Sequence, residues 1–317
     1  MNDHLIGLTL SQIAQHATEV AAIASARLRG FGRKNDADEA AVDAMRRSFQ
    51  LAPFSGKVVI GEGEIDEAPM LYIGEELGAG GPKTDIAVDP LEGTKLCASD
   101  APNAMTVVAL APEGGLLHAP DMYMDKIAIG PGYAHDLIDL DASPTENVTR
   151  LAKAKGVRVQ DIRACLLDRP RHEHIIEELR RAGAGVRLIP DGDVAGVFWT
   201  TETARSGVDI YFGSGGAPEG VLAAAAIRCA NGQMQARLKP ENEQEEQRCR
   251  SMGLDVRAKL TLNHMVPGNV VFAASGVTHG SMFDGVLFDA KAAHVDTLVW
   301  ESFNGRRSRI RSSFPLN

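Results

Sequence analysis

Residues 164–200 read ACLLDRPRHEHIIEELRRAGAGVRLIPDGDVAGVFWT and decide the fold class. Two short apolar runs, Ala164–Leu167 and Val186–Ile189, predict buried strands. Each is followed by a helical pattern, His172–Ala182 and Val194–Thr200 respectively. Such alternation is typical of α/β proteins, in which helices are layered on a sheet. Both strands end in polar loops, which is where ligands bind in such folds.

The alternation continues on both sides of this stretch. Downstream, Val208–Phe212 predicts a strand, residues 213–217 a glycine-rich loop, and Pro218–Cys229 a helix. Upstream, we expect a helix over Leu10–Leu28, a second from Asp36 with Glu39 at capping-box spacing, and strands at Lys57–Ile60, Thr84–Asp89 and Met105–Leu110. We therefore expect two α/β lobes, residues 1–155 and 156–317.

Bulk composition excludes several classes of protein. The 317 residues carry a formal net charge of -9 and no basic stripe, so a nucleic-acid partner is not expected. No apolar run approaches the ~20 residues that a membrane helix needs, and the N-terminus lacks the pattern of a signal peptide. The four cysteines form no CxxC pair and are too few for a disulfide scaffold. We expect a cytoplasmic protein without a membrane partner.

The strongest chemical signal is Asp89-Pro90-Leu91-Glu92-Gly93-Thr94. An apolar strand delivers Asp89, and Pro90 is expected to end that strand because it cannot continue the ladder. The chain then turns, so that Glu92 returns toward Asp89, and Gly93 permits close approach of a ligand. Thr94 adds a hydroxyl and can open a helix whose free N–H groups suit an anion. This turn predicts a site for Mg²⁺ and a phosphate group.

A second group of acids follows the strand at Lys57–Ile60. Glu62, Glu64, Asp66 and Glu67 lie within six residues and would repel one another without a cation. Some of them could equally be solvated loop charges. A dinucleotide-binding loop is rejected because Asp66 occupies the third-glycine position of that motif.

Three further groups are ambiguous on local grounds. Glu219, in Gly215-Gly216-Ala217-Pro218-Glu219-Gly220, could be a metal ligand or could simply favour the helix dipole. The pair Arg169 and Arg171 could clamp a phosphate, and Asp191 and Asp193 could bind sugar hydroxyls; surface or interface salt bridges are the alternative. Lys34 and Asp38 flank a helix start, where an acid is ordinary.

Taken together, these stretches resemble a known family, the class II (GlpX-type) fructose-1,6-bisphosphatases. The resemblance runs in the family's order through nearly the whole chain. Its segments are Lys34-Asn35 with Asp38, Val59–Glu75, Asp85–Thr94, Ala119–Met124, Arg169–His172, Pro190–Val194 and Gly215–Gly220.

The resemblance implies a layered sugar-phosphatase fold like that of inositol monophosphatase and fructose bisphosphatase. In such a fold we expect residues 1–155 to be the metal-binding lobe and 156–317 the substrate-binding lobe of one catalytic unit. It implies metal ligands at Asp38, Glu62, Asp89, Glu92 and Glu219, with Mg²⁺ or Mn²⁺ as the cofactor. It also implies activity-related roles for Lys34 and Asp66, and substrate contacts at Glu92, Gly93, Thr94, Tyr123, Arg169, Pro170, Arg171, Asp191, Gly192, Asp193 and Gly216.

The expected reaction is hydrolysis of the 1-phosphate of fructose 1,6-bisphosphate, in gluconeogenesis or the Calvin cycle. We expect Thr94 and one acid, Glu64 or Asp66, to orient the attacking water. The partner is a small sugar bisphosphate, and a homo-oligomer (dimer or tetramer) is expected. The alternatives are a dual enzyme that also cleaves sedoheptulose 1,7-bisphosphate, as in the cyanobacterial branch, an inositol or nucleotide phosphatase, and a sugar-phosphate sensor without activity.

Overall fold

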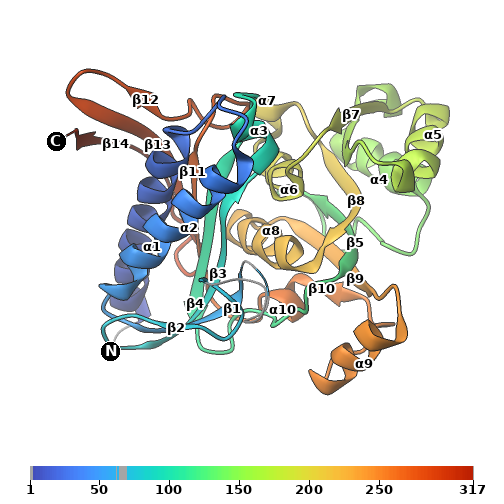
Figure 1. The fold of residues 1–317 in the computed structure, drawn as a ribbon. Coiled ribbons are helices and arrows are strands. Elements are labelled where there is room, and N and C mark those ends of the chain that lie inside the picture. Colours follow the sequence, from blue (N-terminus) through green and yellow to red (C-terminus); the bar gives the residue numbers. More distant parts are fainter. Residues whose placement is uncertain (1–2, 62, 64–69, 317) are drawn as a thin grey trace. The chain divides into compact units, whose positions relative to one another are not determined.

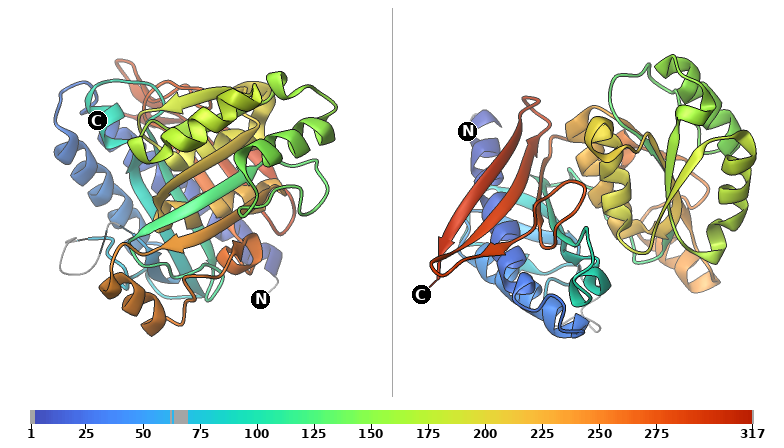
Figure 2. Two further views of the ribbon diagram at one scale, coloured as in Figure 1. Left: turned by 90° about the vertical axis from the view of Figure 1, so that its right-hand side faces the viewer. Right: turned by 90° about the horizontal axis from the view of Figure 1, so that it is seen from above.

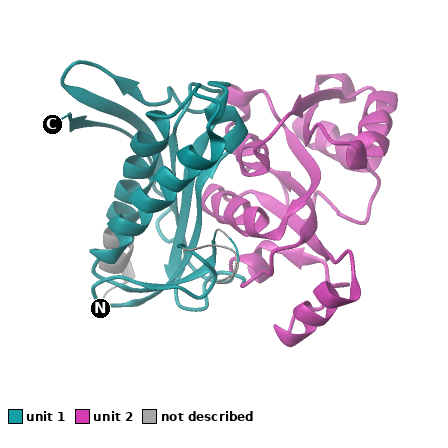
Figure 3. Ribbon diagram, in the orientation of Figure 1, with its two compact units in different colours: residues 1–117, 267–317 teal, residues 118–266 magenta. Residues whose placement is uncertain are grey.

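The computed structural model describes residues 3–61, 63 and 70–316. Contacts divide the chain into two units, residues 1–117 with 267–317, and residues 118–266 (Figure 3). Each unit contains one sheet and several helices, which confirms the predicted α/β class. Within the described residues, no helix combines the length and apolar character needed to cross a membrane.

Unit 1 is built on an eight-stranded sheet (Figure 1). Its strand order is β12-β13-β11-β4-β3-β1-β2, and β14 pairs with β13. Among the described strands of this unit, β1 and β3 pair in parallel and the other pairings are antiparallel. The strands are β1 (Ser55–Ile60), β2 (Glu76–Leu77), β3 (Lys83–Glu92), β4 (Met105–Pro112), β11 (Val271–Gly276), β12 (Leu287–Phe288), β13 (Ala292–Glu301) and β14 (Arg307–Pro315).

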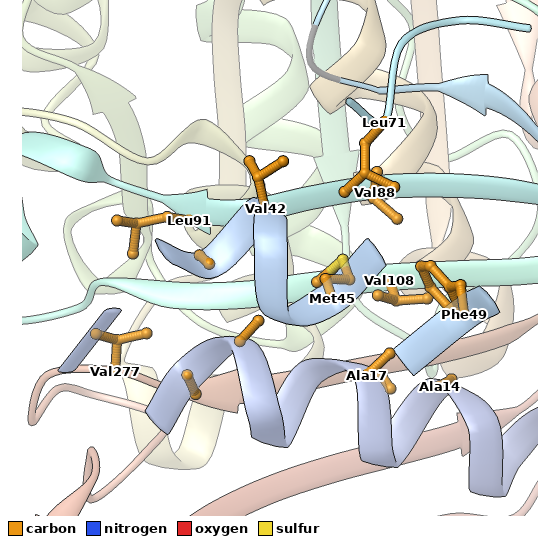
Figure 4. Packing of buried hydrophobic residues seen from close by; sticks show 14 of the residues in the cluster. Ala14, Ala17, Val42, Met45, Phe49, Leu71, Val88, Leu91, Val108 and Val277 are labelled. Carbon is orange, nitrogen blue, oxygen red and sulfur yellow. The ribbon is translucent and has the colours of Figure 1, made fainter. Parts of the chain in front are cut away.

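The helices α1 (Asp3–Ala26) and α2 (Lys34–Gln50) pack on this sheet and on each other, and α2 also contacts α3 (Thr94–Ala98). Small residues on α1, Ala14 and Ala17, face larger ones on α2, Met45 and Phe49, in one buried cluster (Figure 4). Truncating a buried residue such as Phe49 to alanine costs about 3–5 kcal/mol, because a cavity remains. This core gives the strand ends of unit 1 a rigid support.

Unit 2 is built on a six-stranded sheet in the order β10-β9-β5-β8-β6-β7. Ile127 of β5 and Phe212 of β8 join the core under α4 and α5, whereas Tyr211 and Met124 lie against α6 and α8. Helices therefore cover both faces (Figure 2, right). The strands are β5 (Tyr123–Ile129), β6 (Arg163–Leu167), β7 (Gly185–Ile189), β8 (Ile210–Gly216), β9 (Gln233–Lys239) and β10 (Leu260–Thr261).

The helices of unit 2 are mostly short. They are α4 (Pro144–Lys155), α5 (Glu173–Ala182), α6 (Asp193–Trp199), α7 (Thr203–Ser206), α8 (Ala217–Ala230), α9 (Glu243–Ser251) and α10 (Leu262–Met265), with 3₁₀ turns η1 (Val159–Asp161), η2 (Pro170–His172) and η3 (Thr200–Glu202). Glycine or asparagine in the left-handed conformation ends α4, α5 and α8, as expected for helix C-termini.

Several predicted boundaries differ from the structure. The chain divides at residues 117 and 266 rather than at 155, because β11 and β13 return to pair beside β4. Strand β3 continues past Pro90 to Glu92, since a bulge absorbs the proline. Helix α2 begins at Lys34 without a side-chain cap, so the capping box at Asp36 was wrong. Residues 213–216 extend β8 and are not a loop.

Candidate active site

The first part of the candidate site is the acid turn, Asp89–Thr94, in unit 1. Asp89 pairs with Val107 of β4 and Glu92 with Met105, so β3 carries one extra residue at this point. The Asp89 carboxylate accepts a hydrogen bond from the Leu91 N–H at 3.1 Å, which tightens the turn. Gly93 has φ 82°, a left-handed conformation that favours glycine, and Thr94 then begins α3 as predicted. The turn thus holds a half-buried Asp89 and a buried Glu92 close together in the chain.

The start of α2 is held next to this turn within unit 1. Gly30 and Gly32, just before the helix, donate backbone hydrogen bonds of 2.9 and 2.8 Å to Cys97 and Ala98 at the end of α3. Lys34 and Asp38 are one helical turn apart on α2, with Lys34 exposed and Asp38 half-buried. Burial raises the pKa of the Asp38 carboxyl to about 6. A carboxylate held in such surroundings gains from a nearby cation.

The predicted residues Glu62, Glu64, Asp66 and Glu67 lie outside the described residues. The residues that flank them are fixed: the N–H of Ile73 donates to the Gly63 carbonyl at 2.9 Å, and that of Gly74 to Val58 at 2.8 Å. Gly61 passes so close to the Leu71 carbonyl that a Cβ would lie 2.0 Å from its oxygen. The chain therefore enters and leaves this acidic segment at a defined place beside β1.

The second part of the candidate site lies in unit 2, at the β8 end, which we define as Ser214–Gly216. Gly216 ends β8 opposite Tyr123 of β5 and begins the turn into α8. A Cβ on Gly216 would lie 1.8 Å from Oε2 of Glu219, so only glycine leaves room for that carboxylate. Oε2 is buried and has no hydrogen-bond partner among the described residues. Burial, followed by the charge of Asp193, raises the pKa of Glu219 to about 7.

A buried lysine, Lys126, contacts both the β8 end and the first residue of α6. Lys126 of β5 forms an ion pair with Asp193, the first residue of α6, and both side chains are buried. Its ammonium also donates to the Gly216 carbonyl at 2.8 Å. Gly192, with φ 86°, turns the chain so that Asp193 faces this lysine. Removing one partner of such a pair costs about 3–5 kcal/mol, because a buried charge is left unpaired.

The two arginines of the candidate site have different partners. Nε of Arg171 donates to the Ser214 carbonyl at 2.8 Å, and its guanidinium lies 4.9 Å from the centre of the Tyr123 ring. A terminal guanidinium nitrogen of Arg169 lies 3.8 Å from Oδ1 of Asp191, and both side chains are 30% exposed. The salt-bridge alternative therefore applies in part to Arg169 and Asp191. An ion pair this exposed contributes about 0–1 kcal/mol, so both side chains can turn to a ligand at little cost.

The structure thus gathers the predicted residues into two sets. In unit 1, Lys34 and Asp38 belong to the helix held beside the acid turn. In unit 2, the β8 end carries Tyr123, Arg171, Asp193, Gly216 and Glu219 around it. Within the described ranges, no three His, Cys, Asp or Glu side chains are grouped closely enough to hold a metal ion. Glu62, one of the five expected ligands, lies outside those ranges.

Two residues of this region, Lys126 and His172, were not predicted as functional from the sequence. The available signal was a lysine directly before the apolar residues Ile127–Ile129 of one strand, since a buried strand rarely carries an unpaired charge. His172 was only the last residue of a motif, although it is 1% exposed and hydrogen-bonded through both ring nitrogens. Asp193, which pairs with Lys126, is 67 residues away, and Ser214, which donates to His172, is 42 residues away, so local patterns could not identify these contacts.

A hydrolase of phosphate esters needs carboxylates that suit a divalent cation and arginines that suit phosphate, and the two units supply one set each. The family model described as "Bacterial fructose-1,6-bisphosphatase, glpX-encoded" matches residues 9–314. The chain belongs to this family. Relatives include fructose-1,6-bisphosphatase 1 class 2 of Escherichia coli K12 and fructose-1,6-bisphosphatase class 2 of Shigella flexneri. Each is 43% identical over 310 residues, covering 93% of this chain and 92% of the relative.

Solved structures with some similarity include the extragenic suppressor protein suhB of Bartonella henselae and an inositol monophosphatase of Anabaena. The first has a TM-score of 0.40 and 13% identity, covering 69% of this chain and 83% of that one. The second has a TM-score of 0.38 and 16% identity, covering 68% and 80%. Because both scores are low, these similarities carry no argument, and the family assignment rests on the sequence.

Proposed function

We propose that this chain hydrolyses the 1-phosphate of fructose 1,6-bisphosphate to fructose 6-phosphate and inorganic phosphate. The observation that carries the proposal is the family match over residues 9–314, which includes all the predicted site residues. The geometry of the acid turn and of the β8 end supports it, because each presents the side chains that such a reaction needs.

The available donors fit a divalent cation. Oε2 of Glu219 is a buried carboxylate oxygen without a hydrogen-bond partner among the described residues, and such an oxygen is costly unless a cation accompanies it. By family resemblance, Mg²⁺ or Mn²⁺ would be held by Asp38, Glu62, Asp89, Glu92 and Glu219. When bound, the ion would lower the pKa of a coordinated water and stabilise charge on the phosphoryl group.

The remaining steps fall to the chain's own side chains. Thr94 and either Glu64 or Asp66 orient the water that attacks phosphorus. The water oxygen forms a bond to phosphorus, the bond from phosphorus to the C1 oxygen breaks, and that oxygen takes up a proton. Such transfers need little covalent chemistry from the protein, so positioning and charge stabilisation provide most of the rate increase. Lys34 adds a positive charge one helical turn from Asp38.

Side chains of unit 2 hold the rest of the substrate in this proposal. Arg169 and Arg171 bind the distal phosphate, since a guanidinium fork matches phosphate oxygens. Pro170, the first residue of η2, lies between the two arginines in the chain. Asp191, Gly192 and Asp193 form the turn that accepts hydrogen bonds from sugar hydroxyls, and Tyr123 and Gly216 line the sugar.

A phosphate-release panel tests the proposal. Purified protein would be assayed with Mg²⁺, with Mn²⁺ and after exhaustive chelation on fructose 1,6-bisphosphate, sedoheptulose 1,7-bisphosphate, inositol 1-phosphate and a nucleoside 3'-phosphate. We expect fructose 1,6-bisphosphate to be cleaved with either ion and not after chelation. Faster release from inositol phosphate would favour the phosphatase alternative, and full activity after chelation would contradict the metal mechanism.

The cellular setting is part of the proposal. We place the enzyme in the cytoplasm, in gluconeogenesis or the Calvin cycle, as a homo-oligomer. Fractionation with an antibody and light scattering of the purified protein test these two points.

A further inference from the structure

The strands β6 and β8 lie side by side in unit 2 but separate before they end. Their parallel pairing covers Ala164 with Ile210 and Cys165 with Tyr211. Strand β6 then continues to Leu167 and β8 to Gly216, while the opposite edge of β8 stays paired with β5 as far as Gly216. One edge of the β8 end is therefore paired with β5. Its other edge is no longer paired with β6, because the pairing of β6 with β8 ends at Cys165 and Tyr211 and a gap between the two strands follows.

The imidazole of His172 bridges this gap. Nδ1 lies 2.8 Å from the Leu167 carbonyl of β6, and the backbone N–H of Ser214 in β8 donates to Nε2 at 2.8 Å. A carbonyl can only accept and an N–H can only donate, so Nδ1 must carry the proton and Nε2 must be bare. The geometry therefore requires the neutral imidazole in one tautomer.

The surroundings of His172 favour that neutral form. The side chain is 1% exposed, and burial, with the positive charge of Arg171 and the neighbouring His174, lowers its pKa. His172, Arg171 and His174 line a cavity of about 240 Å³, to which β5 contributes Asp125 and Lys126 and β9 contributes Arg237 and Lys239. Of these, Lys126 is paired with Asp193, Arg237 with Asp141, and Lys239 with Asp125.

Both backbone polar groups of Ser214 are hydrogen-bonded to side chains. His172 binds its N–H, and Nε of Arg171 donates to its carbonyl at 2.8 Å. The Arg171 guanidinium lies 4.9 Å from the Tyr123 ring centre and uses Nε for the contact with Ser214. Its two terminal nitrogens have no hydrogen-bond partner in the described part of the chain, so they can bind a ligand. The direction of Arg171 therefore depends on where Ser214 lies.

We propose that His172 is a positioning residue: its neutral imidazole joins β6 to the β8 end, fixes Ser214, and through Ser214 orients Arg171 for the substrate's distal phosphate. This inference rests on the proposed function. His172 does not itself touch the substrate, and protonation of Nε2 would break its bond to Ser214. We therefore expect its loss or protonation to raise KM for fructose 1,6-bisphosphate and to leave kcat nearly unchanged.

Two replacements of His172 separate its two hydrogen bonds. In His172→Gln, the amide oxygen takes the position of Nε2 and can accept the hydrogen bond from the Ser214 N–H. In His172→Asn, the shorter side chain places its amide nitrogen near the position of Nδ1, and no acceptor reaches Ser214. His174→Asn, two residues along and exposed, is the matched control. Loss of a single hydrogen bond predicts that His172→Asn raises KM about tenfold with kcat within about twofold. His172→Gln and His174→Asn should stay within about twofold of wild type in both parameters.

The pH profile distinguishes positioning from a purely structural role. In the wild type and His174→Asn, KM should rise as pH falls through the lowered pKa of His172, below its ordinary 6.5. Titration of the substrate phosphate changes KM equally in all the proteins. The further rise in KM that comes from protonation of His172 should be absent in His172→Gln. Parallel KM profiles in wild type and His172→Gln, or an unchanged KM in a folded His172→Asn protein, would overturn the proposal.

A measurement that needs no turnover completes the test. Nitrogen-15 NMR of the histidine rings should report Nδ1–H and a bare Nε2 for His172 at pH 7.5, and hydrogen exchange at the Ser214 amide should be slow. Exchange should accelerate at least tenfold in His172→Asn but not in His172→Gln. If fructose 1,6-bisphosphate is not cleaved at all, the proposed function fails while these two signals still report on the bridge. The opposite tautomer, or equal exchange in both variants, refutes the bridge whatever the activity.

Discussion

The acid turn of unit 1 and the β8 end of unit 2 are built in opposite ways. In the acid turn, the functional side chains come from six consecutive residues, and the Asp89 carboxylate closes the turn on its own Leu91 N–H. At the β8 end, three backbone groups are held by side chains that are distant in sequence, Lys126, Arg171 and His172. The first region can be recognised as a motif, whereas the second exists only once the sheet has formed. We expect the acid turn to control the rate of the chemical step and the β8 end to control binding.

The largest effect is expected in the acid turn. Asp89→Asn removes one charge at the start of the turn but keeps an oxygen that can accept from Leu91. Because charge stabilisation by a bound metal contributes several kcal/mol, kcat should fall about 10³-fold. The measurement is phosphate release from fructose 1,6-bisphosphate at saturating Mn²⁺, with Glu113→Gln, an exposed acid at the turn after β4, as the control. A decrease of less than tenfold would remove Asp89 from the metal site.

The contrast between the two regions explains what the sequence could predict. The elements around residues 164–200 and the acid turn were predicted closely, because strand periodicity, helix spacing and a turn motif are local signals. Pro90 misled the prediction, since a bulge in β3 accommodates it. The boundary at residue 155 differs from the observed division, because β11 pairs with β4 over more than 160 residues of chain. Such a pairing leaves no local signal. The same holds for Lys126, whose partner Asp193 is 67 residues away.

The next largest effect should be on binding at the β8 end. Arg171→Ala removes two contacts, the bond to Ser214 and the stacking on Tyr123, as well as the charge offered to the distal phosphate. We expect KM to rise about 10- to 100-fold, because a charged hydrogen bond is worth about 1.5–3 kcal/mol. Arg171→Lys should recover only part of this loss, since an ammonium lacks the guanidinium fork. An unchanged KM in both variants would show that Arg171 has a structural role only.

Glu219 tests whether the β8 end also contributes to metal binding. Glu219→Gln keeps the shape of the side chain but removes the charge, so the Mn²⁺ concentration needed for half-maximal activity should rise about 10-fold or more. Without metal, the wild-type carboxylate is buried and its pKa is raised to about 7. Because this pKa lies above the ordinary value of 4.5, the metal-free fold loses stability as pH rises from about 4.5 to 7, and the loss is complete above pH 7. Metal-free Glu219→Gln should therefore melt at a higher temperature than wild type at pH 8. Equal metal response in both proteins would favour the helix-dipole interpretation.

The smallest effect is expected at Thr94, the last residue of the acid turn. Its hydroxyl is proposed to orient the attacking water, an interaction made mainly in the transition state. Thr94→Ala should lower kcat about tenfold with KM little changed, whereas Thr94→Ser should keep most of the activity. Steady-state kinetics of the two variants decide the point. If kcat is unchanged in Thr94→Ala, the hydroxyl has no part in the chemical step.

The most direct test of this account is the identity of the product. If the acid turn acts on the 1-phosphate while Arg169 and Arg171 hold the distal phosphate, phosphorus-31 NMR of the reaction with Mn²⁺ should show two products. These are fructose 6-phosphate and inorganic phosphate, in equal amounts from the first turnovers onward. Accumulation of fructose 1-phosphate would mean that the substrate is held the other way round, and absence of any phosphate release would contradict the proposed function itself.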